Sequence, residues 1–192
     1  MVRLTRTAKT AALVAGSLGV AALMTIFTPV VPATAAPIAA ATSIPKCTAD
    51  DLGVWLAIDQ SDGAAGTIYT PLEFTNLSHH TCYLFGYPGV SALDVNGRQL
   101  GSPASWGSLA GARIVNLAPG ATAHTILGYH DVVVGTAPEC AQVKVATYLR
   151  VYPPGQRGAT LAAFPVEACV HAGPVYMSII EPIIPGVGTI NG

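Results

Sequence analysis

Charged side chains are scarce in this sequence. Only 10% of its 192 residues are Asp, Glu, Lys or Arg, and the basic residues form no cluster outside the first ten positions. Three of the 9 basic residues, Arg3, Arg6 and Lys9, precede a short apolar run, and without them 6 basic residues face 10 acidic ones, a net charge of −4. Binding to phosphate backbones or to an anionic membrane surface needs clustered Lys and Arg. We therefore expect no nucleic-acid partner.

The sequence also lacks the patterns of common hydrolases. No Gly-x-Ser-x-Gly occurs after residue 35, and the adjacent pair His130-Asp131 does not have the arrangement of a catalytic triad. Most acidic residues stand in turn-like segments, where local hydrogen bonding accounts for them. Asp59 and Asp62 could bind calcium, but no third spaced acid accompanies them. We expect a protein that is not an enzyme and has no cofactor.

The single long apolar run is too short for a membrane span. Ala11–Phe27 follows the basic start and precedes Pro29 and the small-residue pattern Ala33-Thr34-Ala35. A spanning helix needs about 20 apolar residues, whereas this arrangement is typical of a secretory signal peptide. We interpret 1–35 as a signal peptide and 36–46 as a Pro/Ala-rich leader. The mature protein is then secreted, extracellular or cell-wall associated, with no stable membrane insertion after signal cleavage.

All four cysteines lie in the exported part of the chain. An even number of cysteines in an oxidising compartment predicts disulfides. Four cysteines allow three pairings, and the sequence does not choose among them. We favour Cys47 with Cys82 and Cys140 with Cys169, because each bridge then joins strands that are close in the chain.

No segment after the leader shows a helical period, and several alternate with the period of a strand. In 67–76, Ile68 and Phe74 alternate with Tyr69 and Glu73, which predicts a strand with one face exposed. Pro71 cannot donate to a ladder, so we expect this strand at a sheet edge or bulged. The segment 143–152 is the clearest strand pattern of the chain.

Two turns predict hairpins. Asn96-Gly97 is the pair that type I′ turns favour, and Ala118-Pro119-Gly120 separates two strand-like segments, 112–117 and 121–129. Seven to nine short strands predict an all-β fold, an immunoglobulin-like antiparallel β-sandwich with two disulfides over residues 47–175. An apolar tail, 176–192, follows it and is expected to form one short strand near its start.

Two tryptophans have different predicted roles. Trp55 lies in a strand pattern with apolar residues on both sides, and we expect it in the core. Trp106 lies in the loop 99–111, where we expect it to fold back over the end of the sandwich, with an exposed contact residue as the alternative. Exposed aromatic residues often contribute to binding. We take Trp106 with Tyr87 and Pro88 as a candidate contact surface for a protein or glycan ligand.

A metal site is the main alternative to a binding surface. His80-Thr81-Cys82 and Cys169-Val170-His171 each place an imidazole and a sulfur two residues apart, on one face of an extended segment. If the two segments met, His80, Cys82, Cys169 and His171 would form a set suited to zinc or copper. Oxidation of the cysteines in an exported protein favours the disulfide interpretation.

The nine residues Cys82–Val90, with their Gly-Tyr-Pro-Gly corner, together with Phe74-Thr75-Asn76, Leu117-Ala118-Pro119-Gly120 and Cys140, resemble the domain of unknown function 4232. The resemblance covers about Cys47 to Cys169. It implies an exported or membrane-anchored actinobacterial protein with a disulfide-bearing β domain and no recognised catalytic residues. We expect a monomeric, non-catalytic binding module of the extracellular space or cell envelope.

Overall fold

A computed structural model describes residues 43–107, 111–130, 140, 142–171, 173 and 176–190. The predicted signal peptide and the leader up to residue 42 lie outside these residues. Within them the chain forms strands and turns and one short 3-10 helix, Ile58–Gln60 (η1), with no α-helix. In this part of the chain no helix is long and apolar enough to cross a membrane. The prediction of an all-β fold is confirmed.

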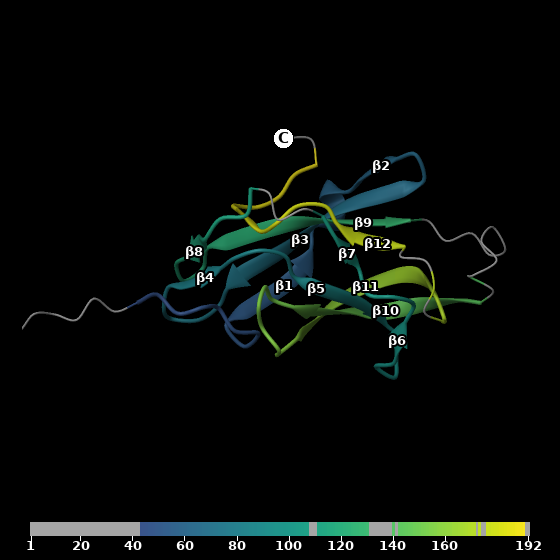
Figure 1. Ribbon diagram of the computed structural model, residues 1–192, viewed down its shortest axis with the longest axis horizontal. Coiled ribbons are helices and arrows are strands. Elements are labelled where there is room, and N and C mark those ends of the chain that lie inside the picture. The colour runs from purple at the N-terminus through teal and green to yellow at the C-terminus, as the bar shows by residue number, and fades with distance from the viewer. Residues whose placement is uncertain are drawn as a thin grey trace, which may run out of the picture. The chain divides into compact units, whose positions relative to one another are not determined.

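The strands form two larger sheets and one small one (Figure 1). The larger sheet has the order β1-β3-β9-β12-β7, with β2 paired to β3 and β13 paired to β9. The second sheet has the order β11-β10-β5-β6, and β4 pairs with β8 in the third. The bounds in the first sheet are β1 Leu52–Leu56, β2 Asp62–Ala64, β3 Thr67–Asn76, β7 Ser105–Trp106, β9 Thr122–His130, β12 Met177–Ile179 and β13 Ile184–Pro185. Those in the other two are β4 Cys82–Leu84, β5 Gly89–Leu93, β6 Gln99–Leu100, β8 Val115–Leu117, β10 Val143–Tyr152 and β11 Thr160–Cys169.

The two larger sheets share one apolar core. Leu72 and Phe74 of β3 are fully buried, as are Leu149 and Val151 of β10, and all four belong to a single cluster. Alternate residues of a strand face opposite sides, so each sheet turns one apolar face toward the other. The strands therefore lie in two facing layers, while the immunoglobulin-like topology stays a prediction.

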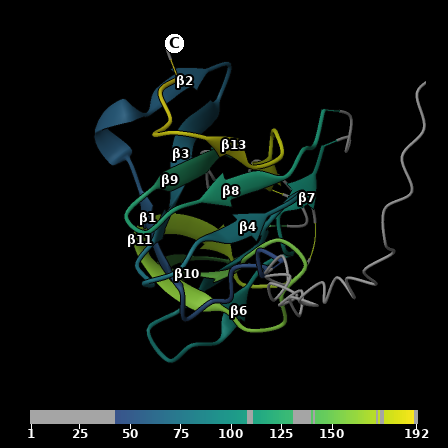
Figure 2. The ribbon, with the colours of Figure 1, turned by 90° about the vertical axis from the view of Figure 1, so that its left-hand side faces the viewer.

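The small sheet lies between the two layers at one end (Figure 2). The turn at Ala118 forms as predicted, with Ala121 N–H donating to the Ala118 carbonyl over 2.9 Å. The hairpin does not, because β8 pairs with β4 whereas β9 pairs with β3. The chain changes sheets at this turn, and Cys82, Leu84, Val115 and Leu117 thereby join the shared core.

The prediction that Pro71 marks a sheet edge or bulge is wrong, because β3 lies between β1 and β9 and pairs with β9 without interruption. On its other side, β1 pairs with Leu72–Asn76 and β2 with Thr67–Tyr69, so Pro71 lies in the gap between them. Pro71 has no backbone N–H to place there, and its carbonyl accepts the Ala57 N–H over 3.0 Å. A gap between two partner strands therefore accommodates proline inside a sheet.

The Asn96-Gly97 turn joins β5 and β6 as expected, but its type differs from the prediction. Gly97 has φ of +75°, whereas Asn96 does not have the positive φ that a type I′ turn requires. Asp94 holds the turn instead, since its Oδ1 accepts the N–H groups of Asn96 at 3.0 Å and Arg98 at 2.9 Å. Both bonds lower the pKa of Asp94, and the bond from the Arg98 N–H has the larger effect.

The segment from 176 onward is paired and partly buried. β12 pairs antiparallel with β9 and parallel with β7, and β13 pairs with β9 farther along. Ile183 is fully buried, and its N–H donates to the Gly86 carbonyl over 2.9 Å. The described residues all belong to one compact unit, 41–192. The apolar segment therefore adds two strands to the larger sheet.

Candidate functional site

The Gly-Tyr-Pro-Gly corner between β4 and β5 brings two of the predicted contact residues beside the third. The rings of Tyr87 and Trp106 stack with centroids 6.4 Å apart at 20°. Trp106 Nε1–H donates to the Pro88 carbonyl over 2.8 Å. The structure therefore brings together all three of the residues predicted as a contact surface, from two segments of the chain.

These aromatic residues border a hollow of about 300 Å³. Its walls come from the corner, from β7, and from the end of β10 with the turn after it. The lining residues are Tyr87, Gly89, Trp106, Tyr152, Pro153, Gly155 and Gln156. Tyr152 enters the site because it pairs directly with Gly89 across β10 and β5.

Trp106 is exposed although its ring is held in place. Its exposed fraction is 61%, whereas that of Tyr87 beneath it is 6%. The expectation that Trp106 folds back to cover the end of the sandwich is therefore wrong, and the exposed alternative holds. Gly107, directly after Trp106, allows the chain to pass close to Ile180 and Tyr87. A Cβ at this position would lie 2.9 Å from the Ile180 carbonyl oxygen and 3.1 Å from Tyr87 Oη.

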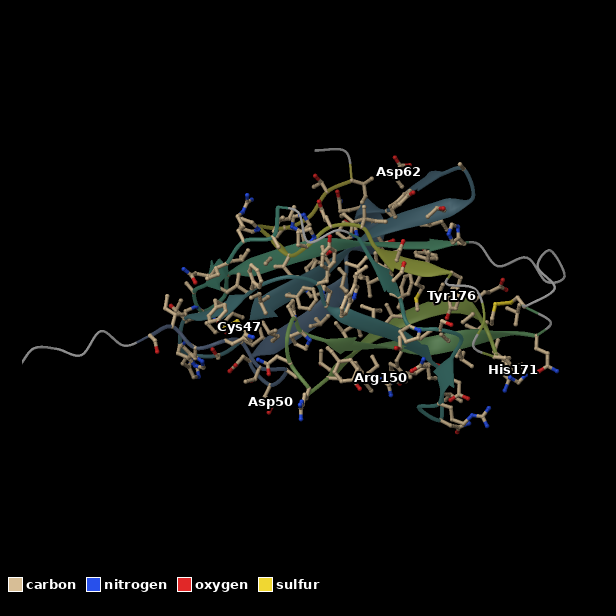
Figure 3. The ribbon with its side chains drawn as sticks, in the orientation of Figure 1. Cys47, Asp50, Asp62, Arg150, His171 and Tyr176 are labelled. Atoms are coloured by element: carbon tan, nitrogen blue, oxygen red, sulfur yellow. A yellow bond between two sulfur atoms is a disulfide. The ribbon has the colours of Figure 1, made fainter. Side chains whose placement is uncertain are left out.

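Two cationic side chains lie against residues that line the hollow, although neither lines it itself. The guanidinium carbon of Arg150 lies 5.7 Å from the ring centroid of Tyr152, and Nη2 donates to Gln99 Oε1 over 2.7 Å. Arg150 lies on the outer side of the four-stranded sheet (Figure 3), since its neighbours in β10, Leu149 and Val151, are fully buried. The ammonium nitrogen of Lys46 lies 2.8 Å from the position of a Cβ on Gly155.

Sequence reasoning missed Tyr152, Gln156, Arg150 and Lys46. The strand pattern of 143–152 and the turn Pro153-Pro154-Gly155 were both visible in the sequence. Nothing in them indicated proximity to Tyr87, because the pairing of β10 with β5 joins segments about 60 residues apart. The second tryptophan also departs from expectation: Trp55 is 44% exposed, so its placement in the core was wrong.

Both disulfides have the favoured pairing, Cys47 with Cys82 and Cys140 with Cys169. The alternative zinc or copper set is not assembled, because Cys82 and Cys169 belong to different bridges and offer no thiolate. Cys47, bonded to Cys82, and His171 lie at opposite ends of the view in Figure 3. No group of three or more His, Cys, Asp or Glu residues within the described ranges could hold a metal ion.

A second polar cluster is closed off by the end of the chain. Glu73 was predicted on an exposed face, yet it is fully buried and lies opposite His124 in the β3–β9 ladder. Glu73 Oε1 accepts the Gly188 N–H over 2.9 Å, and His124 Nδ1 lies 2.8 Å from the Gly186 carbonyl oxygen. Burial raises the pKa of Glu73. Because the C-terminal segment occupies this face, Glu73 and His124 anchor the chain and form no open site.

The lining of the hollow combines aromatic rings with few polar side chains. The polar side chains among the lining residues are those of Gln156, Tyr87 and Tyr152, and the Trp106 indole N–H is bonded to the Pro88 carbonyl. Stacking on an exposed indole and hydrogen bonding at the rim are what such a surface offers a ligand.

Fold and site together define a disulfide-bridged, two-layered β domain with a shallow aromatic hollow. The family profile of DUF4232, a domain of unknown function, matches residues 47–176. The chain belongs to this family, as the resemblance in its sequence indicated. No curated protein and no solved structure matches the chain.

Proposed function

We propose that this protein is a secreted, non-catalytic binding module of the extracellular space or cell envelope, and that the aromatic hollow is its contact site. The proposal is carried by Tyr87 and Trp106, which line the hollow together, and by Pro88, whose carbonyl holds the indole in place. An indole that is 61% exposed, yet fixed by a hydrogen bond from Nε1, presents apolar area that is already ordered. Preordered aromatic surface is favourable for binding because little conformational entropy is lost on contact.

Two further observations support this function. The two disulfides suit an oxidising compartment outside the cytosol. The chain's low charge leaves no basic patch for nucleic acid. The partner is then a protein or glycan of the envelope or its surroundings, met by a monomer.

Two exposed tryptophans provide a matched test. The secreted mature protein is incubated with insoluble cell-envelope material of the producing organism and with an immobilised glycan panel, and bound protein is measured against concentration. Trp106→Ala is expected to weaken binding at least tenfold, the effect of removing a central aromatic contact. Trp55→Ala removes an exposed tryptophan of β1, at the opposite edge of the same sheet from β7, and is expected to bind as the wild type does. Equal binding by wild type and Trp106→Ala contradicts the proposal.

A further inference from the structure

Unpaired positive charge adjoins the hollow of a domain that is negative overall. The described residues contain two ion pairs, His80 with Asp51 and Arg98 with Asp94, and neither involves Lys46 or Arg150. No carboxylate stands among the described residues that line the hollow. Complementarity of charge therefore favours an anionic ligand at this site.

The size and shape of the hollow narrow the choice of ligand. A volume of about 300 Å³ is at the lower end for ligand pockets, so it admits one ring-sized group. A ligand with a flat apolar surface would stack on the exposed face of Trp106. The Gln156 amide offers this ligand a polar contact at the same hollow. A pyranose ring has both, since its C–H groups form an apolar face and its hydroxyls lie at the edge. An acidic peptide side chain provides the charge but no ring to cover the indole.

We propose that the hollow binds a carboxylate-bearing saccharide unit, an inference that rests on the binding function proposed above. The sugar ring stacks on Trp106, and its carboxylate lies toward Lys46. Arg150 adds a longer-range attraction, because its Nη2 is engaged by Gln99 and its guanidinium lies over Tyr152. The ligand class is thus an acidic glycan of the cell envelope or surroundings.

Three probes separate the contributions of ring and charge. Calorimetric titration of the mature protein uses a hexamer of galacturonic acid, the same hexamer fully methyl-esterified, and a hexaglutamate peptide. The acidic hexamer is expected to bind roughly tenfold more tightly than its neutral ester at low ionic strength, a factor that the exposed contact with Lys46 and the longer-range attraction of Arg150 supply together. Molar salt is expected to remove most of that difference, because exposed charges are screened.

A pair of lysine variants locates the charge effect. Lys46→Gln is expected to weaken binding of the acidic hexamer about two- to fivefold and to leave the ester unchanged. Lys144→Gln is the matched control, because Lys144 lies near the start of β10, at the other end of the strand from Tyr152. An equal loss in both variants would show a nonspecific effect of net charge and would overturn the inference.

The outcomes also separate this inference from the proposed function. If the ester binds as tightly as the acid, the anionic class is wrong, while a loss on Trp106→Ala in the envelope assay still supports a binding module. If hexaglutamate binds as well as the acidic hexamer, the saccharide class is wrong. If none of the three probes binds, the inference is overturned whatever the envelope assay gives.

Discussion

Gly188 lies where the C-terminal segment crosses β3 and β9, and its replacement by alanine tests how this segment is held. A Cβ at Gly188 would lie 2.5 Å from Cδ2 of His124 and 2.8 Å from Cβ of Pro71. Carbon atoms in contact keep about 3.5–4.0 Å, so a shift of about 1 Å is required. The neighbours cannot give way, because both belong to rings on paired strands of one sheet. The segment itself must therefore move.

The expected cost has two parts. Forcing a methyl group into a packed site costs about 1–3 kcal/mol. The shift also weakens the bond from Gly188 N–H to Glu73, whose other oxygen, Oε2, is already buried without a partner in the part of the chain described. Hydrogen bonds to charged groups contribute about 1.5–3 kcal/mol. The two costs do not add in full, because the segment can detach from the sheet instead of bearing both. We therefore expect the free energy of unfolding to fall by about 2–3 kcal/mol.

Urea denaturation followed by circular dichroism measures this change. Gly63→Ala is the control, because Gly63 is exposed and its Cβ would meet only the Thr67 carbonyl oxygen, at 3.9 Å. Hydrogen exchange adds a local reading, in which the Gly186 amide, bonded to the Thr122 carbonyl over 2.9 Å, loses protection in Gly188→Ala. If Gly188→Ala unfolds within about 0.5 kcal/mol of the wild type, as surface substitutions do, this account of the segment is refuted.

Three further predictions concern the buried acid and the bridges. Burial raises the pKa of Glu73 above 4.5, so the fold favours its protonated form, and stability falls as pH rises above that value by at most about 1.4 kcal/mol per pH unit. Glu73→Gln should remove this slope in urea titrations at several pH values; parallel curves would contradict it. Replacing Cys47 and Cys82 by alanine opens a loop of 35 residues. From chain entropy, the free energy of unfolding measured by denaturation should fall by about 4 kcal/mol. A fall of less than about 1 kcal/mol would contradict this. Intact mass should be roughly 4 Da lower than that of the reduced protein, with no alkylation before reduction; a bound metal and free thiols would contradict this.

Local patterns in the sequence were sufficient for the elements and for part of the site. Alternation with period two predicted β3 and β10, and four cysteines in a chain with a predicted signal peptide predicted two bridges, with the favoured pairing observed. The corner at Tyr87 and the tryptophan at position 106 were selected as contact residues by their chemistry, and the structure brings them together.

Partners and burial could not be predicted in this way. The turn at Ala118 has the composition of a hairpin, yet the strands on either side of it join different sheets. Glu73 alternates as an exposed residue would, yet it is buried and accepts a hydrogen bond from Gly188, 115 residues away in the chain. Local sequence does not encode which distant segment covers a given face, since that depends on the packing of the whole domain.

The sequence by itself therefore determined the β class, the two bridges and the aromatic residues of the candidate contact surface, because each depends on chemistry within a few residues or on the predicted redox compartment. Only the tertiary structure decided that Tyr152 completes the hollow, that Lys46 and Arg150 place positive charge beside it, and that the end of the chain belongs to the sheet. These features arise from pairings between segments far apart in the chain, which form when the apolar faces of the layers are buried together.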